Sequence, residues 1–161
     1  MELQKWLSQI DYVSKFKKYG VQYRKYPALN LMIIKRVYGS KYSKNKFWLN
    51  YCRGLVIDYT TNKVVFIPPV KSQEISTYEK FTGLQESPTN LVDGTMINMF
   101  YYNEQWLIST RSNIGCNNKW SSNDSFKDMF NDCSKGLNYD TLNKEFTYSF
   151  VMRHVNNQLT S

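Results

Sequence analysis

The sequence predicts an α+β domain in which antiparallel sheets are flanked by a few helices. Two pairs of β-rich runs, each joined by a short polar turn, predict hairpins over residues 54–67 and 95–110. Apolar residues at three- and four-residue spacing predict one helix at the N-terminus and another near residues 125–134. Hairpins with segregated helices are typical of an antiparallel α+β arrangement, and 161 residues are the length of a single domain, 1–161.

The predicted N-terminal helix is amphipathic. Its apolar face combines Leu3, Trp6, Leu7, Ile10 and Val13. Gly20 is expected to end this helix, because glycine often follows the last helical residues. The apolar run 29–34 comes next, and since it is too short for a capped helix it predicts a buried strand.

Two hairpins follow that strand. In the first, strands 55–59 and 63–67 are joined by Thr60-Thr61-Asn62, and Pro68-Pro69 ends the pairing because proline cannot donate to a sheet. The second consists of strands 95–102 and 106–110 with a turn at 103–105. The segment 71–90 between them carries turn residues and weak periodicity, which predicts a connection with one short helix.

A second helix and a last strand complete the expected order. Ser122 or Asn123 is expected to cap the helix. Its buried face would carry Phe126, Met129, Phe130 and Cys133. Strand 146–152 is predicted to follow, and no repeat or low-complexity linker interrupts the chain, which favours one domain.

The charge balance indicates an anionic partner. Lys and Arg number 21 against 13 Asp and Glu, which gives a net charge of +8. Such a field attracts polyanions, so RNA or single-stranded nucleic acid is a predicted partner. Aromatic residues make up 16% of the chain and include 13 tyrosines, which offers many surfaces for base stacking or for core packing. The alternative is a solvated basic surface that serves solubility alone.

The cysteines and the histidine do not suggest a metal site. Cys52, Cys116 and Cys133 lack the paired spacing of a zinc site, and His154 is the only histidine. The odd number of cysteines predicts a reducing compartment such as the cytoplasm. No run of apolar residues is long enough to span a membrane, so no membrane partner is expected.

Polar groups stand at the ends of the predicted strands. They are Arg53, Lys71, Asp93, Gly94 and Arg111. Binding sites are often built at such ends, because a rigid sheet holds the side chains in place. Arginine and lysine there would contact phosphate groups, and we predict these five residues as a nucleotide-binding site. In the alternative, Arg53 and Arg111 pair with Asp58, Asp93 or backbone carbonyls and hold the hairpins together.

Three segments carry a family resemblance, namely "CRGLVIDYTTNKVVFIPPVKS", "VDGTMINMFYY" and "SFVMRHVNN". Over about residues 31–157 the chain resembles the RNA ligase branch of the covalent nucleotidyltransferases, which includes the mRNA capping enzymes. More narrowly it is similar to ligase-like proteins of large DNA viruses. The resemblance implies an adenylation-domain fold, ATP or GTP with Mg as cofactors, and a virus-encoded protein of the host cytoplasm or virion.

The chain departs from the pattern that the resemblance implies. The family nucleophile is a lysine two residues before the Asp-Gly, where this chain has Leu91, and an isobutyl group cannot attack the α-phosphate of a nucleotide. Val151 stands where a carboxylate is expected, and the chain ends at Ser161 before two further motifs. A degenerate or partial domain without catalytic residues is therefore expected, in which Lys71 contacts phosphate.

Three functions remain open from the sequence. The first is a nucleotidyltransferase-type domain that is inactive and binds nucleotide or nucleic acid. The second is an active ATP-dependent RNA ligase or capping-type enzyme whose nucleophile lies elsewhere, for example at Lys71. The third is a viral structural or interaction protein that uses the fold as a scaffold.

Overall fold

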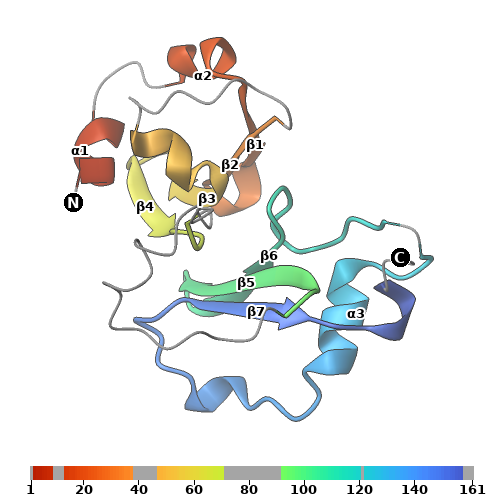
Figure 1. Cartoon of the computed structure of the whole chain (residues 1–161). Coiled ribbons are helices and arrows are strands. Elements are labelled where there is room, and N and C mark those ends of the chain that lie inside the picture. The colour runs from red at the N-terminus through yellow and green to blue at the C-terminus, as the bar shows by residue number, and fades with distance from the viewer. Residues whose placement is uncertain (1, 9–12, 38–46, 71–91, 121, 158–161) are drawn as a thin grey trace, which may run out of the picture.

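The fold consists of two antiparallel sheets and a small number of helices (Figure 1). The computed structural model describes residues 2–8, 13–37, 47–70, 92–120 and 122–157. Sheet A has the order β1-β2-β3-β4, and sheet B has the order β6-β5-β7. In chain order the helices and strands are α1 (Glu2–Leu7), α2 (Ser14–Lys18), β1 (Val21–Tyr26), β2 (Leu31–Arg36), β3 (Arg53–Asp58), β4 (Lys63–Phe66), β5 (Thr95–Tyr102), β6 (Gln105–Ser109), α3 (Phe126–Cys133) and β7 (Tyr148–Met152).

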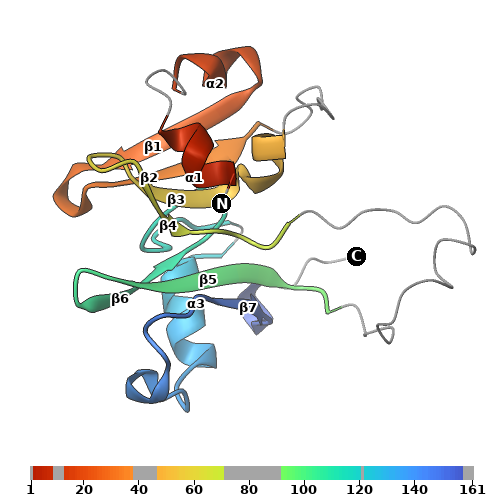
Figure 2. The same cartoon turned by 90° about the vertical axis from the view of Figure 1, so that its left-hand side faces the viewer.

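Sheet A is covered on its outer face by the N-terminal helices and the 3₁₀ helix Phe47–Tyr51. Trp6 of α1 stacks on Trp48 with ring centroids 4.5 Å apart, and Phe16 of α2 packs against both rings. In Figure 2, α2 lies on the side of sheet A that faces away from sheet B. The apolar side chains of the N-terminal segment therefore form one core with the outer face of sheet A.

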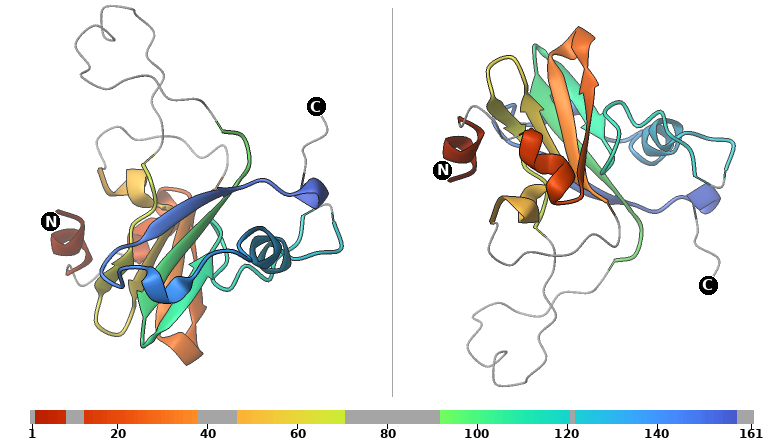
Figure 3. Two further views of the ribbon diagram at one scale, coloured as in Figure 1. Left: turned by 90° about the horizontal axis from the view of Figure 1, so that it is seen from below. Right: turned by 90° about the horizontal axis from the view of Figure 1, so that it is seen from above.

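A second core joins the two sheets. Ile33 and Val56 of sheet A face Phe100 of sheet B, and Phe66 stacks on Phe100 with centroids 5.5 Å apart. Hydrogen bonds fix the same interface, since the Tyr102 hydroxyl donates to Asp58 Oδ2 at 3.1 Å. The outer face of sheet B packs on α3, and α1 and α3 lie on opposite sides of the molecule (Figure 3).

Both predicted hairpins are confirmed. β3 pairs with β4 and β5 pairs with β6, each antiparallel. The second turn is tighter than predicted, because β6 begins at Gln105 and the turn consists of Asn103 and Glu104. Their φ angles of 46° and 63° are typical of a two-residue hairpin turn that matches the twist of the strands. The predicted buried strand is β2, whose first four residues are buried.

The C-terminal helix differs from the prediction at both ends. Its N-cap is Ser125 rather than Ser122 or Asn123, because the Ser125 hydroxyl accepts from the Asp128 backbone N–H while the Asp128 carboxylate accepts from the Ser125 N–H. Phe126, Met129 and Phe130 are buried as predicted. Cys133 is exposed, since it is the last helical residue and extends past the apolar face.

The N-terminal region also differs from the single helix that was predicted. Two short helices, α1 and α2, stand in its place, and residues 9–12 lie outside the described part of the chain. Strand β1 was not predicted, because five of its six residues face outward or are half-buried and no alternation is visible. The predicted connection 71–90 lies outside the described residues.

Candidate functional site

The strand ends that carry the candidate residues lie at one edge of the two sheets, the strand-end edge. In sheet A the end of β2 pairs with the start of β3, with Lys35 opposite Arg53. In sheet B the start of β5 pairs with the end of β7, with Thr95 opposite Met152. Figure 2 shows the end of β4 and the start of β5 directed to the same side of the molecule. Antiparallel pairing thus gathers segments that are far apart in the sequence.

Arg111 connects the two sheets at this edge. It follows β6 of sheet B, and its Nη2 donates to the carbonyl oxygen of Arg36 at the end of β2 at 3.0 Å. The backbone of Arg111 also lies directly over Gly54, where an added Cβ would be 3.2 Å from Arg111 Cα. Gly54 has a φ of +111°, which residues other than glycine rarely adopt. The segment after β6 therefore packs closely on the Arg53-Gly54 pair of sheet A.

Three arginines, Arg36, Arg53 and Arg111, thus lie near one another at the strand-end edge. Partial burial and the nearby positive charges of Arg53 and Arg36 lower the pKa of Arg111, although arginine stays protonated at neutral pH. Within the described residues, neither Arg53 nor Arg111 forms an ion pair with a carboxylate. We name this group of three residues, Arg36, Arg53 and Arg111, the arginine cluster.

The alternative role that the sequence allowed for these arginines is seen in part. Arg111 does donate to a backbone carbonyl and so helps to hold the two sheets together. Asp58, by contrast, accepts hydrogen bonds from Thr60, Thr61 and Tyr102. These bonds outweigh its partial burial and lower its pKa to about 2. Asp58 therefore stabilises a turn and the contact between sheets and does not neutralise the arginine cluster.

Asp93 and Gly94 stand just before β5 and are exposed. Gly94 lies against β7, because an added Cβ would be 2.6 Å from the Met152 carbonyl oxygen and 2.8 Å from Val151 Cγ1. Val151 and its Cα partner Met96 are both exposed, at 43% and 42%. The Asp-Gly segment thus sits beside an apolar pair on sheet B, and it forms no hydrogen bond or ion pair with the arginine cluster in the described part of the chain.

Lys71 and Leu91 lie outside the described residues. Of the five predicted site residues, Arg53 and Arg111 lie near one another. Asp93 and Gly94 lie at the same edge, before β5. A nucleotide site shared by these residues stays a prediction. Arg36 was missed by the sequence analysis. The available signal was its position at the end of the predicted buried strand, in the segment "IIKRVYG".

The other reactive groups of the described residues do not form a site. Burial raises the pKa values of Cys52 and Cys116 to about 12, so both thiols stay protonated. His154 Nδ1 accepts from the Asn156 N–H and its Nε2 lies 3.2 Å from Asp132 Oδ2, which orders the C-terminal segment against α3. No three His, Cys, Asp or Glu residues in the described ranges gather as a metal site would require, and none of the helices found there has the length and apolarity to cross a bilayer.

Comparisons with known proteins give a viral relative. The chain is 31% identical over 129 residues to the "Immediate-early protein ICP-46 homolog" of Invertebrate iridescent virus 3. The match covers 68% of this chain and 29% of that protein, so the chain spans less than a third of the relative's length. No family model matches the sequence, and the comparison with solved structures found no significant match.

Proposed function

We propose that the protein is a nucleotidyltransferase-type domain without catalytic activity, which binds phosphate groups of a nucleotide or of a nucleic-acid end at its strand-end edge. The observation that carries the proposal is the arginine cluster. Positive charges gathered at one edge favour an anion, and guanidinium groups bind phosphate through paired, charge-assisted hydrogen bonds. The order of the motifs along the chain and two antiparallel sheets support the fold type.

The lost chemistry supports an inactive domain. A covalent nucleotidyltransferase needs an amine at the position of Leu91, and Leu91 carries none. The Asp-Gly segment contacts Val151, so an apolar side chain occupies the place where the resemblance implies a carboxylate. Magnesium requires oxygen ligands, and the described residues offer no group of carboxylates at this edge. The described residues at this edge therefore fit the phosphates of a nucleotide.

Nucleotide binding tests the proposal directly. A fluorescent ATP analogue should bind the protein, and Arg111→Ala should weaken binding about 10- to 150-fold, the worth of a hydrogen bond to a charged group. Lys5→Ala, which removes one exposed charge from α1, is the matched control and should change binding little. Equal losses in the two variants, with both still folded by circular dichroism, would contradict a specific phosphate site.

The source of the phosphate and the absence of catalysis need separate measurements. Oligonucleotides with a 5′-phosphate and with a 5′-hydroxyl distinguish a nucleic-acid end from a free nucleotide, because the arginine cluster would favour the phosphorylated end alone. Incubation with radiolabelled ATP or GTP and a denaturing gel should show no covalent label on the protein. An acid-labile label that maps to Lys71 would instead establish the enzyme that the sequence left open.

A further inference from the structure

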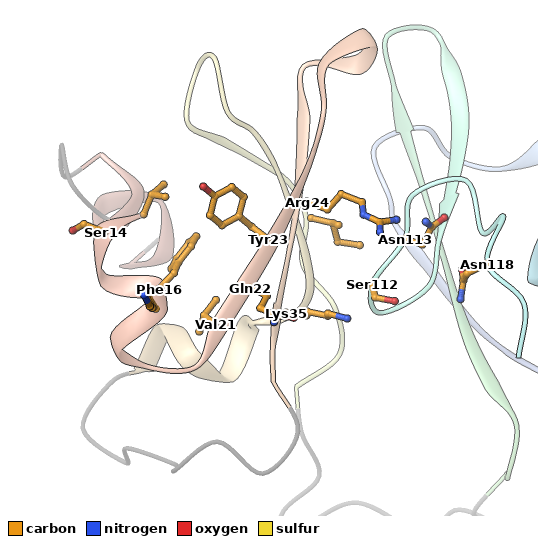
Figure 4. A pocket seen from close by; sticks show the side chains of 13 residues that line it. Ser14, Phe16, Val21, Gln22, Tyr23, Arg24, Lys35, Ser112, Asn113 and Asn118 are labelled. Atoms are coloured by element: carbon orange, nitrogen blue, oxygen red, sulfur yellow. The ribbon is translucent and has the colours of Figure 1, made fainter.

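A groove lies where the β1–β2 hairpin of sheet A faces the loop after β6, as part of a hollow of about 700 Å³. Arg24 and Ile33 are Cα partners, and Lys35 follows Ile33 by two residues, so the three side chains share the inner face of sheet A. Figure 4 shows Arg24 and Lys35 directed toward the loop that carries Ser112 and Asn113. The hollow also continues around the edge strand β1 toward α2.

Both ends of the loop are fixed to the hairpin. Arg111 donates to the Arg36 carbonyl at one end, and the Ile114 N–H donates to the Tyr26 hydroxyl at 3.0 Å at the other. Ile114 is also buried in the core between the sheets. The loop therefore forms a wall alongside the hairpin, so the groove exists before any ligand binds.

The groove is basic along its length. A smaller hollow of about 300 Å³ shares Gln22, Lys35 and Ser112 with the first and opens onto Arg36 and Arg111. Among the residues that the structure describes, no carboxylate lines either hollow. Within the described residues, Arg24 and Lys35 form no ion pair. Two cations thus stand in line with the arginine cluster, between uncharged amide and hydroxyl groups that can donate hydrogen bonds.

We propose that this groove binds the phosphate backbone of a single-stranded nucleic acid, which runs from the arginine cluster along the β1–β2 hairpin past Arg24. Trp120 is 66% exposed two residues beyond the groove residue Asn118, and an exposed indole is a stacking surface for a base.

The inference extends the proposed function, because it adds the groove to the arginine cluster and assigns to it the internal phosphates of a strand instead of a terminal phosphate. Its test is fluorescence anisotropy with an oligouridylate of about 12 nucleotides that ends in a 5′-hydroxyl, within the usual site size of such proteins. Each phosphate neutralised on a single strand contributes about 0.7 log units per tenfold change in salt. The double variant Arg24→Ala/Lys35→Ala should therefore bind about 25-fold more weakly at about 0.1 M salt, and its salt dependence should be flatter by about 1.4.

A matched control removes the same charge elsewhere. Lys5→Ala/Lys63→Ala changes two exposed lysines on α1 and β4 that line neither hollow, and it should keep nearly the affinity of the unchanged protein. Equal losses in both double variants would overturn the groove, as would equally tight binding of an oligoglutamate of the same charge. Binding of the ATP analogue tests the two proposals separately. Arg24→Ala/Lys35→Ala should keep its affinity for the analogue, whereas Arg111→Ala should lose it, so the groove can fail while the phosphate site holds.

Discussion

Gly54→Ala should destabilise the protein strongly, because this position combines a backbone conformation with a close contact. An alanine at a φ of +111° is strained by about 1–3 kcal/mol. Its Cβ would also lie 3.2 Å from Arg111 Cα and 3.3 Å from Arg111 O, and forcing this backbone contact apart adds about 1 kcal/mol. We expect a loss of about 2–4 kcal/mol in the free energy of unfolding.

Urea denaturation followed by circular dichroism measures this loss as a lower midpoint with an unchanged slope. In thermal unfolding the same loss lowers Tm by about 5–15 °C for a chain of this size. Gly136→Ala is the matched control, because its added Cβ would meet nothing within 4 Å. It should change stability by no more than about 0.5–1 kcal/mol. If the two variants unfold at the same urea concentration, the inference that the Arg111 backbone packs closely on Gly54 is wrong.

Three further predictions concern a carboxylate, the thiols and a helix cap. Because the folded-state pKa of Asp58 is about 2 instead of 3.8, its stabilising effect is present above pH 3.8 and is lost as the pH falls toward 2. Asp58→Asn should therefore be less stable at neutral pH, and urea unfolding should show that this difference shrinks below pH 3.8. Ellman's reagent should label Cys133 in the folded protein, and Cys52 and Cys116 after unfolding, so fast labelling of two thiols in the native state would contradict their burial. Ser125→Ala should lower the free energy of unfolding by about 1 kcal/mol, whereas Ser125→Thr should retain most of the cap.

Local patterns were sufficient wherever neighbours along the chain decide the structure. The hairpin at residues 95–109 follows from alternation and a polar turn, and both its strands form as predicted within a residue. The spacing of Phe126, Met129 and Phe130 gives the buried face of α3 in the same way. The N-cap moved to Ser125 because a capping box depends on where the first helical turn starts, and three serines or asparagines compete within four residues.

Other features could not be predicted because they depend on partners far along the chain. β1 shows no alternation, since only one of its six residues is buried, and the strand forms through its pairing with β2. The need for glycine at position 54 arises from Arg111, which is 57 residues away in the sequence. The need for glycine at position 94 likewise arises from a distant segment, because an added Cβ there would clash with the end of β7.

The candidate site, too, was predicted only in part from the sequence. The sequence by itself determined an α+β chain with a net charge of +8, the two hairpins, and strand ends that carry Arg53, Asp93 and Arg111. The tertiary structure decided that Arg36 joins Arg53 and Arg111 and that Arg24 and Lys35 line a groove beside them. The physical reason is that side-chain identity and local spacing specify which groups a chain carries, whereas the pairing and packing of sheets determine which of those groups meet.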